Sequence, residues 1–219
     1  MDRKAGISLA LGIGLSLAGQ VLSRVLERVG LGILAYMVLG ISGLVLLHTW
    51  HAIPRRRDIG LLFRGMGLAL VCIGAVLGIC LLFSGRIQPG PGIDWLWFPA
   101  VCLGALWEES VHRGLILPAL RVLDRWPAIF LGAAWFAICH GSGMSVTHML
   151  CGTLLGLCAT DTDSVWTGIG FHALWNMLGL VLGRVYVLHG PAEQAEWAVL
   201  VCTCIVMALR LKRKEDEHV

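Results

Sequence analysis

The amino-acid sequence concentrates ionisable side chains where an apolar environment makes them costly. The stretch 95–120 is apolar on both flanks, but its centre carries Glu108, Glu109, His112 and Arg113. An ionisable group near the centre of a bilayer costs about 2.5–3.5 kcal/mol even on the lenient insertion scale. These residues therefore indicate a functional site.

Two of these groups are spaced to pair within one helix. Glu109 and Arg113 stand at i and i+4 with the acid on the N-terminal side, the favourable order for a helical ion pair. Such a pair offsets much of the desolvation cost of both groups. Glu108 has no arginine at this spacing, and it lies about 20 Å from the start of its stretch at 1.5 Å per residue, near mid-membrane. The ion pair explains how Glu109 and Arg113 can lie in an apolar stretch, whereas Glu108 has no such partner.

Two further polar pairs occur on other apolar stretches. Phe136 and His140 stand at i and i+4, as do His172 and Asn176, so each pair presents one face of a helix. Counted from the ends of their stretches, His140 and Asn176 also fall at middle depths. A carboxylate, two imidazoles and an amide that converge in a low-dielectric cavity are the groups of a hydrolytic site.

The elements that must position these groups are membrane helices. The chain is 57% hydrophobic and 14% charged, and its mean hydropathy is +0.79, which is typical of a protein dissolved in a bilayer. Continuous apolar runs favour helices over barrel strands. We predict a single all-α transmembrane domain over 1–219, a polytopic bundle of about eight spans. The predicted spans are 5–22, 31–49, 60–84, 95–120, 127–141, 144–160, 165–188 and 196–211.

The basic residues predict the orientation of the bundle. With an even number of spans both termini lie on one side, and a cytoplasmic N-terminus leaves only Arg24, Arg28 and Arg86 on the other side. We expect the first stretch to be a retained signal anchor, because the next apolar run follows closely. The cytoplasmic basic residues are then Arg3, Lys4, Arg55, Arg56, Arg57, Arg121, Arg125, Arg210, Lys212, Arg213 and Lys214.

The remaining composition argues against other classes. All eight cysteines lie in apolar stretches without a Cys-x-x-Cys pair, so they indicate small buried side chains. The net charge of +3 is modest, and the basic residues flank apolar stretches, so no nucleic-acid partner is predicted.

At its polar motifs the chain resembles the CPBP family of glutamic-type intramembrane proteases, named for CAAX processing and bacteriocin processing and related to the Ras-converting CAAX endopeptidases. The family pattern Glu-Glu-x-x-x-Arg is met by Glu108, Glu109 and Arg113. The patterns Phe-x-x-x-His and His-x-x-x-Asn are met by the other two pairs. The resemblance covers about 95–180, the expected catalytic core. One departure is His112, where many members have an aromatic residue; at i+4 from Glu108 it could tune that carboxylate, or it could reach toward the cytoplasmic interface.

The resemblance implies an endopeptidase in which a glutamate-activated water attacks a peptide bond, with no covalent intermediate and no cofactor. Glu108 would be the general base, assisted by His140. His172 and Asn176 would polarise the carbonyl and stabilise the oxyanion. Glu109, Arg113 and Phe136 would support the site, and no residue would bind a metal.

Two other chemistries could use these residues or a neighbouring one. Glu108, His140 and His172 would make a plausible zinc site, although the His-Glu-x-x-His mark of a zinc protease does not occur. Cys139 suggests a thiol protease, but consecutive helical residues point about 100° apart and a buried thiol is a poor nucleophile. His148 has no motif partner, and we expect it to be structural.

A non-enzymatic class also remains: a catalytically inactive membrane scaffold or immunity protein on the same fold. Against it, every polar motif position is filled. If the chain is an enzyme, its expected partners are the bilayer and a membrane-anchored protein or peptide precursor. We expect a multi-pass protein of a prokaryotic cell membrane that cleaves a leader peptide or a C-terminal sorting signal, the latter as in the myxosortase-like branch. The oligomeric state is not predicted.

Overall fold

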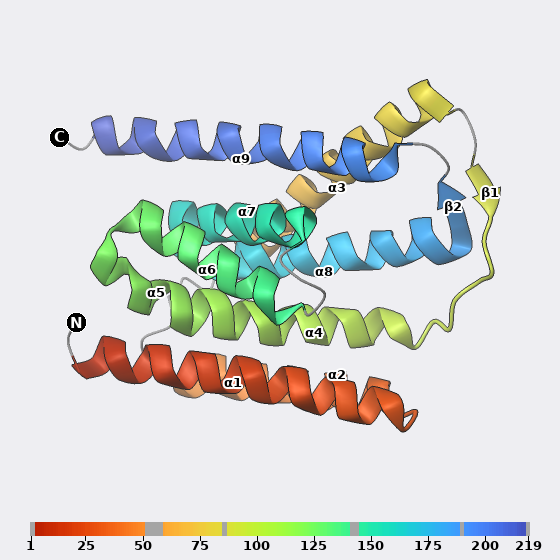
Figure 1. The fold of residues 1–219 in the computed structure, drawn as a ribbon. Helices are drawn as coiled ribbons and strands as arrows, with labels where there is room; N and C mark the ends of the chain where they lie inside the picture. The colour runs from red at the N-terminus through yellow and green to blue at the C-terminus, as the bar shows by residue number, and fades with distance from the viewer. Residues whose placement is uncertain (1–2, 51–58, 85–86, 141–144, 189–190, 218–219) are drawn as a thin grey trace.

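The structure is a computed structural model that describes residues 3–50, 59–84, 87–140, 145–188 and 191–217. Its helices lie side by side in a layered bundle, and α3 crosses the others obliquely (Figure 1). The layer at one side consists of α1 (Arg3–Arg28) and α2 (Gly32–Thr49). The turn between these helices contains Gly30 with φ +77°, a conformation that favours glycine.

The opposite side of the bundle consists of α3 (Ile59–Ser84) and α9 (Ala192–Asp216). These two helices, together with α1 and α2, are the four described helices that are long and apolar enough to cross a membrane. Large apolar side chains such as Val71, Leu82 and Val206 are exposed on their outer faces. Lipid is the environment in which such faces are stable, and the chain is an integral membrane protein.

The central layer carries the polar motifs. It begins with α4 (Trp97–Val111), which continues through a π-helical segment (His112–Ile116) into the short α5 (Leu117–Leu120). After a 3₁₀ turn (Arg121–Leu123) come α6 (Arg125–Cys139), α7 (Val146–Thr162) and α8 (Trp166–Leu180), the last followed by a second π-helical segment (Val181–Val185). An antiparallel pair of three-residue strands, β1 (Ile87–Pro89) and β2 (Tyr186–Leu188), lies at one end of the bundle.

The π-helical segment after α4 has a local cause in the sequence. Pro118 has no backbone N–H, so the carbonyl four residues earlier loses its usual donor. The preceding N–H, of Leu117, donates instead to the carbonyl of His112, five residues back. Such π turns are frequent at functional sites, and this one begins four residues after Glu108.

Two glycines allow α3 and α8 to pack backbone against backbone. A Cβ at Gly65 would lie 2.0 Å from the carbonyl oxygen of Thr167, and one at Gly170 would lie 2.1 Å from that of Leu62. Small residues at such crossings are typical of helix association in membranes. Any side chain at either position would push α8, and the residues it carries, away from α3.

The structure supports part of the predicted topology and corrects part of it. Each predicted stretch coincides with a helix, but α6 and α7 have only 15 and 17 residues, about 22–26 Å in length. That all eight stretches cross a membrane therefore stays a prediction. The predicted span 165–188 extends three residues too far, because α8 continues through the π-helical segment only to Val185 and residues 186–188 form β2. The all-α class holds apart from this small sheet.

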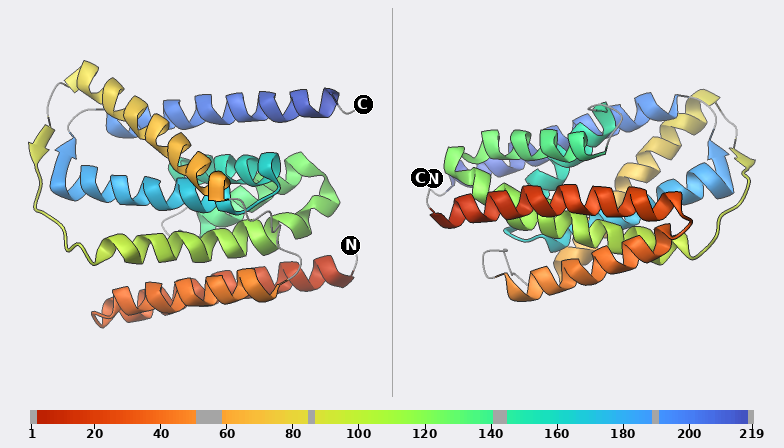
Figure 2. Two further views of the ribbon diagram at one scale, coloured as in Figure 1. Left: turned by 180° about the vertical axis from the view of Figure 1, so that it is seen from behind. Right: turned by 60° about the horizontal axis from the view of Figure 1, so that its bottom comes forward.

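The start of α1 and the end of α9 lie at the same end of the bundle, opposite β1 and β2 (Figure 2). Ion pairs fasten α9 to α6 and α7 at this end, since Arg125 pairs with Glu215 and Lys214 pairs with Asp161, whose side chain is 5% exposed. Arg55, Arg56 and Arg57, used to predict the orientation, lie outside the described residues. The assignment of this end to the cytoplasm stays a prediction.

Candidate active site

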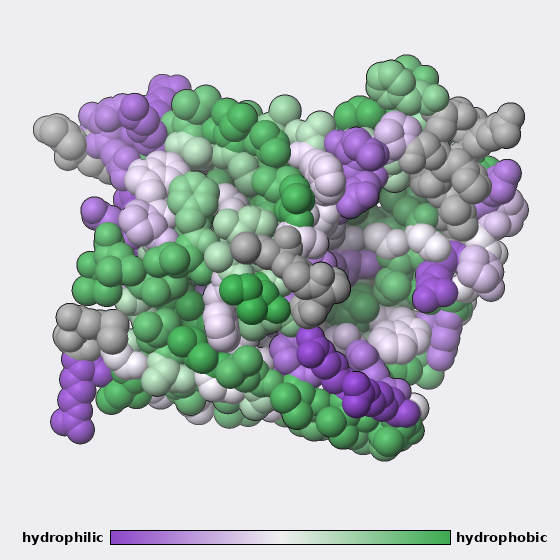
Figure 3. Space-filling model, in the orientation of Figure 1, coloured by the Kyte–Doolittle hydropathy of each residue, from purple (hydrophilic) through white to green (hydrophobic). Residues whose placement is uncertain are grey.

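A cavity of about 370 Å³ lies between the α1–α2 layer and the central layer. Residues of α1, α2, α4, α6, α7 and α8 line it, and many of them are polar. The space-filling view shows this face of the molecule, where hydrophilic residues gather around a recess in a largely hydrophobic surface (Figure 3). A polar cavity inside an apolar bundle is where membrane proteins place costly ionisable groups.

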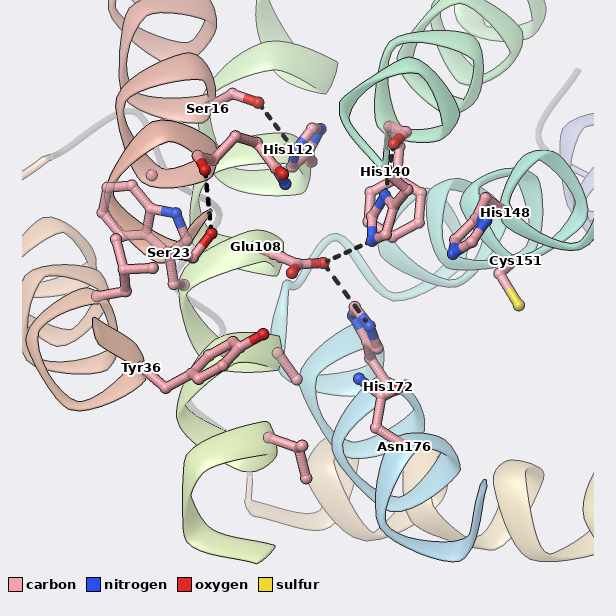
Figure 4. A pocket seen from close by; sticks show the side chains of 18 of the residues that line it. Ser16, Ser23, Tyr36, Glu108, His112, His140, His148, Cys151, His172 and Asn176 are labelled. Carbon is pink, nitrogen blue, oxygen red and sulfur yellow. Dashed lines mark hydrogen bonds and ion pairs between the residues drawn. The ribbon is translucent and has the colours of Figure 1, made fainter. Parts of the chain in front are cut away.

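Glu108 lies at the centre of this cavity, in the last turn of α4. Its Oε2 atom lies 3.5 Å from Nε2 of His140 and 3.8 Å from Nε2 of His172. The close-up shows the carboxylate pointing between the two imidazoles, which come from α6 and α8 (Figure 4). The structure thus brings together three of the predicted site residues from three separate helices.

His140 is held in a defined protonation pattern by the backbone of its own helix. It caps the C-terminal end of α6, and its Nδ1 atom lies 2.7 Å from the carbonyl oxygen of Phe136. A carbonyl oxygen only accepts hydrogen bonds, so Nδ1 carries the proton and donates. The other ring nitrogen, Nε2, therefore faces Glu108 and the cavity. This contact explains the spacing of Phe136 and His140, because an i, i+4 pair shares one helical face.

His172 is oriented by the neighbour of Glu108. Its Nδ1 atom lies 3.0 Å from Oε1 of Glu109, whose side chain is fully buried. A carboxylate only accepts, so Nδ1 donates to Glu109 and Nε2 faces Glu108. The two consecutive glutamates thus have different roles. The carboxylate of Glu108 enters the cavity, and that of Glu109 orients His172 from behind it.

Arg113 holds Glu109 in place. Its Nη1 atom lies 3.2 Å from Oε1 of Glu109, so the predicted ion pair is present, and its Nη2 atom donates to the carbonyl of Gly152 at 2.9 Å. The guanidinium also stacks over the ring of Phe136, 4.5 Å from its centroid. The buried arginine thereby links the π-helical segment to α6 and α7.

The packing around Glu109 leaves no room for a larger neighbour. A Cβ at Gly168, on α8, would lie 2.7 Å from Oε2 of Glu109. Only glycine lets α8 approach the carboxylate closely enough for His172, one turn later, to reach it. The sequence on α8 thus supplies both the histidine and the space for its partner.

Asn176, the remaining predicted residue, lines the same cavity one helical turn beyond His172. In the close-up it lies below His172 on α8, on the side of that helix that faces the cavity. Of the seven predicted site residues, five line the cavity, and Glu109 and Arg113 lie behind it in contact with His172 and Phe136; the five are Glu108, Phe136, His140, His172 and Asn176.

His148, which was expected to be structural, also lies at the cavity. Its ring stacks on that of His140, with centroids 4.3 Å apart and planes inclined by 26°, and it lines the cavity. Ser145 caps the start of α7 by accepting from the N–H of His148 at 3.2 Å, which places the histidine in the first turn of α7. Because α6 ends beside the start of α7, the first turn of one helix meets the last turn of the other.

His112, the departure from the family pattern, also lies at the cavity. Its side chain is 4% exposed, its Nε2 atom lies 3.4 Å from Oγ of Ser16, and its ring meets Phe136 edge to face. It points toward α1 within the bundle. The alternative that His112 reaches toward a membrane interface was therefore wrong.

The first two helices complete the cavity, and the sequence analysis did not predict this. Polar side chains of α1 and α2 form the wall opposite the histidines: Ser16, Gln20, Ser23, Arg24, Glu27 and Tyr36. Their spacing on α1 is visible in the sequence, but a spacing does not say which helix a face meets.

Within the described part of the chain, no group of three or more His, Cys, Asp or Glu side chains is arranged to hold a metal ion. Glu108 meets its two histidines at 3.5 and 3.8 Å, as direct contacts. Elemental analysis and chelation distinguish the zinc alternative from the glutamate mechanism.

Comparison with known families gives one match. Residues 90–178 match the model of the family described as type II CAAX prenyl endopeptidase Rce1-like. No curated protein matches the chain. The matched segment contains all the predicted site residues from Glu108 to Asn176, whereas α1, α2, α3 and α9 lie outside it. The myxosortase-like branch receives no support from this match. The chain is thus an integral membrane protein in which residues 90–178 are similar to the Rce1-like family of CAAX prenyl endopeptidases.

Proposed function

We propose that this protein is a glutamate-dependent intramembrane endopeptidase. The observation that carries the proposal is the position of Glu108, whose carboxylate lies between Nε2 of His140 and Nε2 of His172 in a polar cavity. The similarity of residues 90–178 to the Rce1-like family of prenyl endopeptidases supports the same reaction class.

The attacking group in this mechanism is a water molecule next to Glu108 and His140. Oε2 of Glu108 and Nε2 of His140 lie 3.5 Å apart at the cavity, so one water beside the pair can contact both groups. Glu108 accepts a proton from that water while the water oxygen attacks the carbonyl carbon of the scissile peptide. Because Nδ1 of His140 is committed to Phe136, Nε2 is free to assist in positioning the water.

Attack converts the carbonyl oxygen into an oxyanion, which His172 and Asn176 stabilise. In its doubly protonated form, His172 donates through Nδ1 to Glu109 and through Nε2 toward the cavity. The side-chain amide of Asn176 supplies a second donor on the same helical face. Donors held in place before the reaction stabilise developing charge most effectively, because they need not reorganise.

Collapse of the tetrahedral intermediate breaks the carbon–nitrogen bond. The proton held by Glu108 passes to the leaving nitrogen, so the products are a new carboxyl terminus and a new amino terminus. The carboxylate of Glu108 is thereby regenerated without a covalent intermediate. The substrate we propose is a membrane-anchored protein or peptide precursor, since an apolar outer surface surrounds the cavity.

The two histidines provide the first test of this mechanism. His140→Ala and His172→Ala should each lower the cleavage rate by at least about 10²-fold, the usual contribution of general-base and oxyanion groups. The assay uses purified protein in proteoliposomes with a pool of synthetic single-span peptides, and products are identified by mass spectrometry. In heavy-oxygen water, each new carboxyl terminus should contain one heavy oxygen from the solvent.

His48→Ala is the matched control, because His48 lies on α2 and does not line the cavity. It should retain the wild-type rate. A near-wild-type rate in His140→Ala or His172→Ala would show that the histidine concerned is structural only. No cleavage of any peptide by the wild-type protein would instead favour an inactive scaffold.

A further inference from the structure

One face of α1 carries a line of polar residues that the mechanism does not use. The residues follow one another at intervals of four, three, one and three, so they share a helical face. They are Ser16, Gln20, Ser23, Arg24 and Glu27, and all of them line the cavity that contains Glu108. Ser16 is buried, Gln20 and Ser23 are half-buried, and Arg24 and Glu27, near the end of α1, are exposed.

This face lies opposite the catalytic residues. Figure 4 shows Ser16 and Ser23 of α1 and Tyr36 of α2 on one side of Glu108, and His140, His148 and His172 on the other. A peptide whose scissile bond lies at Glu108 therefore has the histidine wall on one side and α1 on the other. The position makes α1 a substrate-binding surface, and this helix lies outside the Rce1-like segment.

Most of the polar groups on this wall already have partners. Glu27 accepts a hydrogen bond from the hydroxyl of Tyr36 at 3.2 Å, and Ser23 donates to the backbone carbonyl of Gln20 at 3.1 Å. Arg24 differs, because no carboxylate among the residues that the structure describes forms an ion pair with it. By contrast, Arg113, the buried arginine of the site, has both a carboxylate and a carbonyl as partners.

We propose that Arg24 binds a carboxylate of the peptide substrate, either an acidic side chain or a free C-terminus close to the scissile bond. A guanidinium matches a carboxylate with two parallel hydrogen bonds, which makes arginine well suited to this recognition. The carboxylate of Glu108 repels a second anion, so the substrate's acidic group is directed to the Arg24 side of the cavity. This inference rests on the proposed function and adds a substrate class to it.

The test uses matched peptides and four proteins. The peptides are single-span sequences that carry Asp, Asn or Lys at each position around the cleavage site, each made with a free and with an amidated C-terminus. The proteins are wild type, Arg24→Gln, Arg24→Glu and Arg28→Gln. Arg28 is the control, because it is the last residue of α1 but does not line the cavity.

Wild type and Arg28→Gln should cleave the preferred carboxylate peptide at least about tenfold faster than its uncharged partner. Arg24→Gln should lose this preference, and Arg24→Glu should favour the Lys peptide. Loss of the preference on amidation identifies the C-terminus as the ligand, and its retention identifies the Asp side chain. Equal cleavage of charged and uncharged peptides by wild type, or an unchanged preference in Arg24→Gln, overturns the inference.

Binding of the same peptides separates this inference from the proposed function. Peptide affinity is measured on Glu108→Gln protein with and without Arg24→Gln. If wild type cleaves nothing but carboxylate peptides bind more tightly only when Arg24 is present, the protease assignment fails and the carboxylate site stands. If affinity does not depend on Arg24, the carboxylate site is wrong whether or not cleavage occurs.

Discussion

Glu108→Gln is expected to reduce peptide-bond hydrolysis by at least about 10³-fold, within the range that general bases contribute. The amide keeps the shape of the carboxylate and its place between His140 and His172, but it cannot accept a proton from water. The side chain is 21% exposed at the cavity and forms no pair with Arg113, so its neutralisation removes no structural contact of that kind. The variant should therefore accumulate in membranes at the wild-type level.

The rate is measured with the proteoliposome assay, and folding is measured by thermal unfolding of the purified protein. Glu193→Gln serves as the matched control, because Glu193 is an exposed glutamate in the first turn of α9 outside the cavity. It should leave both quantities unchanged. Hydrolysis by Glu108→Gln at the wild-type rate would contradict the glutamate mechanism.

Arg113→Ala is expected to reduce the amount of folded protein as well as its activity. The substitution leaves the fully buried carboxylate of Glu109 without its cation and the carbonyl of Gly152 without its donor. Removal of one partner from a buried ion pair costs about 3–5 kcal/mol. The cation stacked on Phe136 is lost as well. Protein yield in membranes and the thermal unfolding midpoint measure the effect.

An exposed ion pair with the same i, i+4 spacing, in the reverse order, provides the control. Arg213 and Glu217 also stand at i and i+4, at 2.9 Å, but the arginine is 83% exposed. Arg213→Ala should cost less than about 1 kcal/mol, as exposed ion pairs do. Normal accumulation and an unchanged midpoint for Arg113→Ala would show that the buried pair contributes little to stability.

A double variant distinguishes the charge from the packing. Glu109→Gln combined with Arg113→Gln removes both charges and keeps most of the volume, so it should recover part of the folded protein. It should not recover activity, because His172 loses the carboxylate that orients its ring. No gain in folded protein over Arg113→Ala would show that the loss arises from packing.

Local spacing in the sequence was sufficient to predict the polar pairs. The ion pair of Glu109 and Arg113 is present, and the i, i+4 spacing of Phe136 and His140 corresponds to a hydrogen bond from the ring to the backbone. The free-energy cost of placing a charged group in a bilayer narrowed the list of candidate site residues further, because few ionisable groups lie inside the apolar stretches. The catalytic roles of these residues stay predictions until the variants are assayed.

Contacts between helices could not be predicted from spacing alone. His148 belongs to none of the spaced pairs in the sequence, and it meets His140 only because the start of α7 lies beside the end of α6. The polar face of α1 becomes part of the site only because α1 packs beside α4 and the π-helical segment. Nor can hydropathy separate a short apolar strand from the end of a helix, which is why the region around β2 was predicted as part of a span.

The most direct test of the central claim combines chelation, activity and elemental analysis on one purified sample. If Glu108 activates water itself, protein treated with a strong chelator should keep its full cleavage rate, and zinc should not copurify in stoichiometric amount. If Glu108, His140 and His172 instead bind zinc, chelation should abolish cleavage and added zinc should restore it. We expect the first result, cleavage that survives chelation and no stoichiometric zinc. About one zinc per chain in the wild type, lost in Glu108→Gln together with activity, would contradict it.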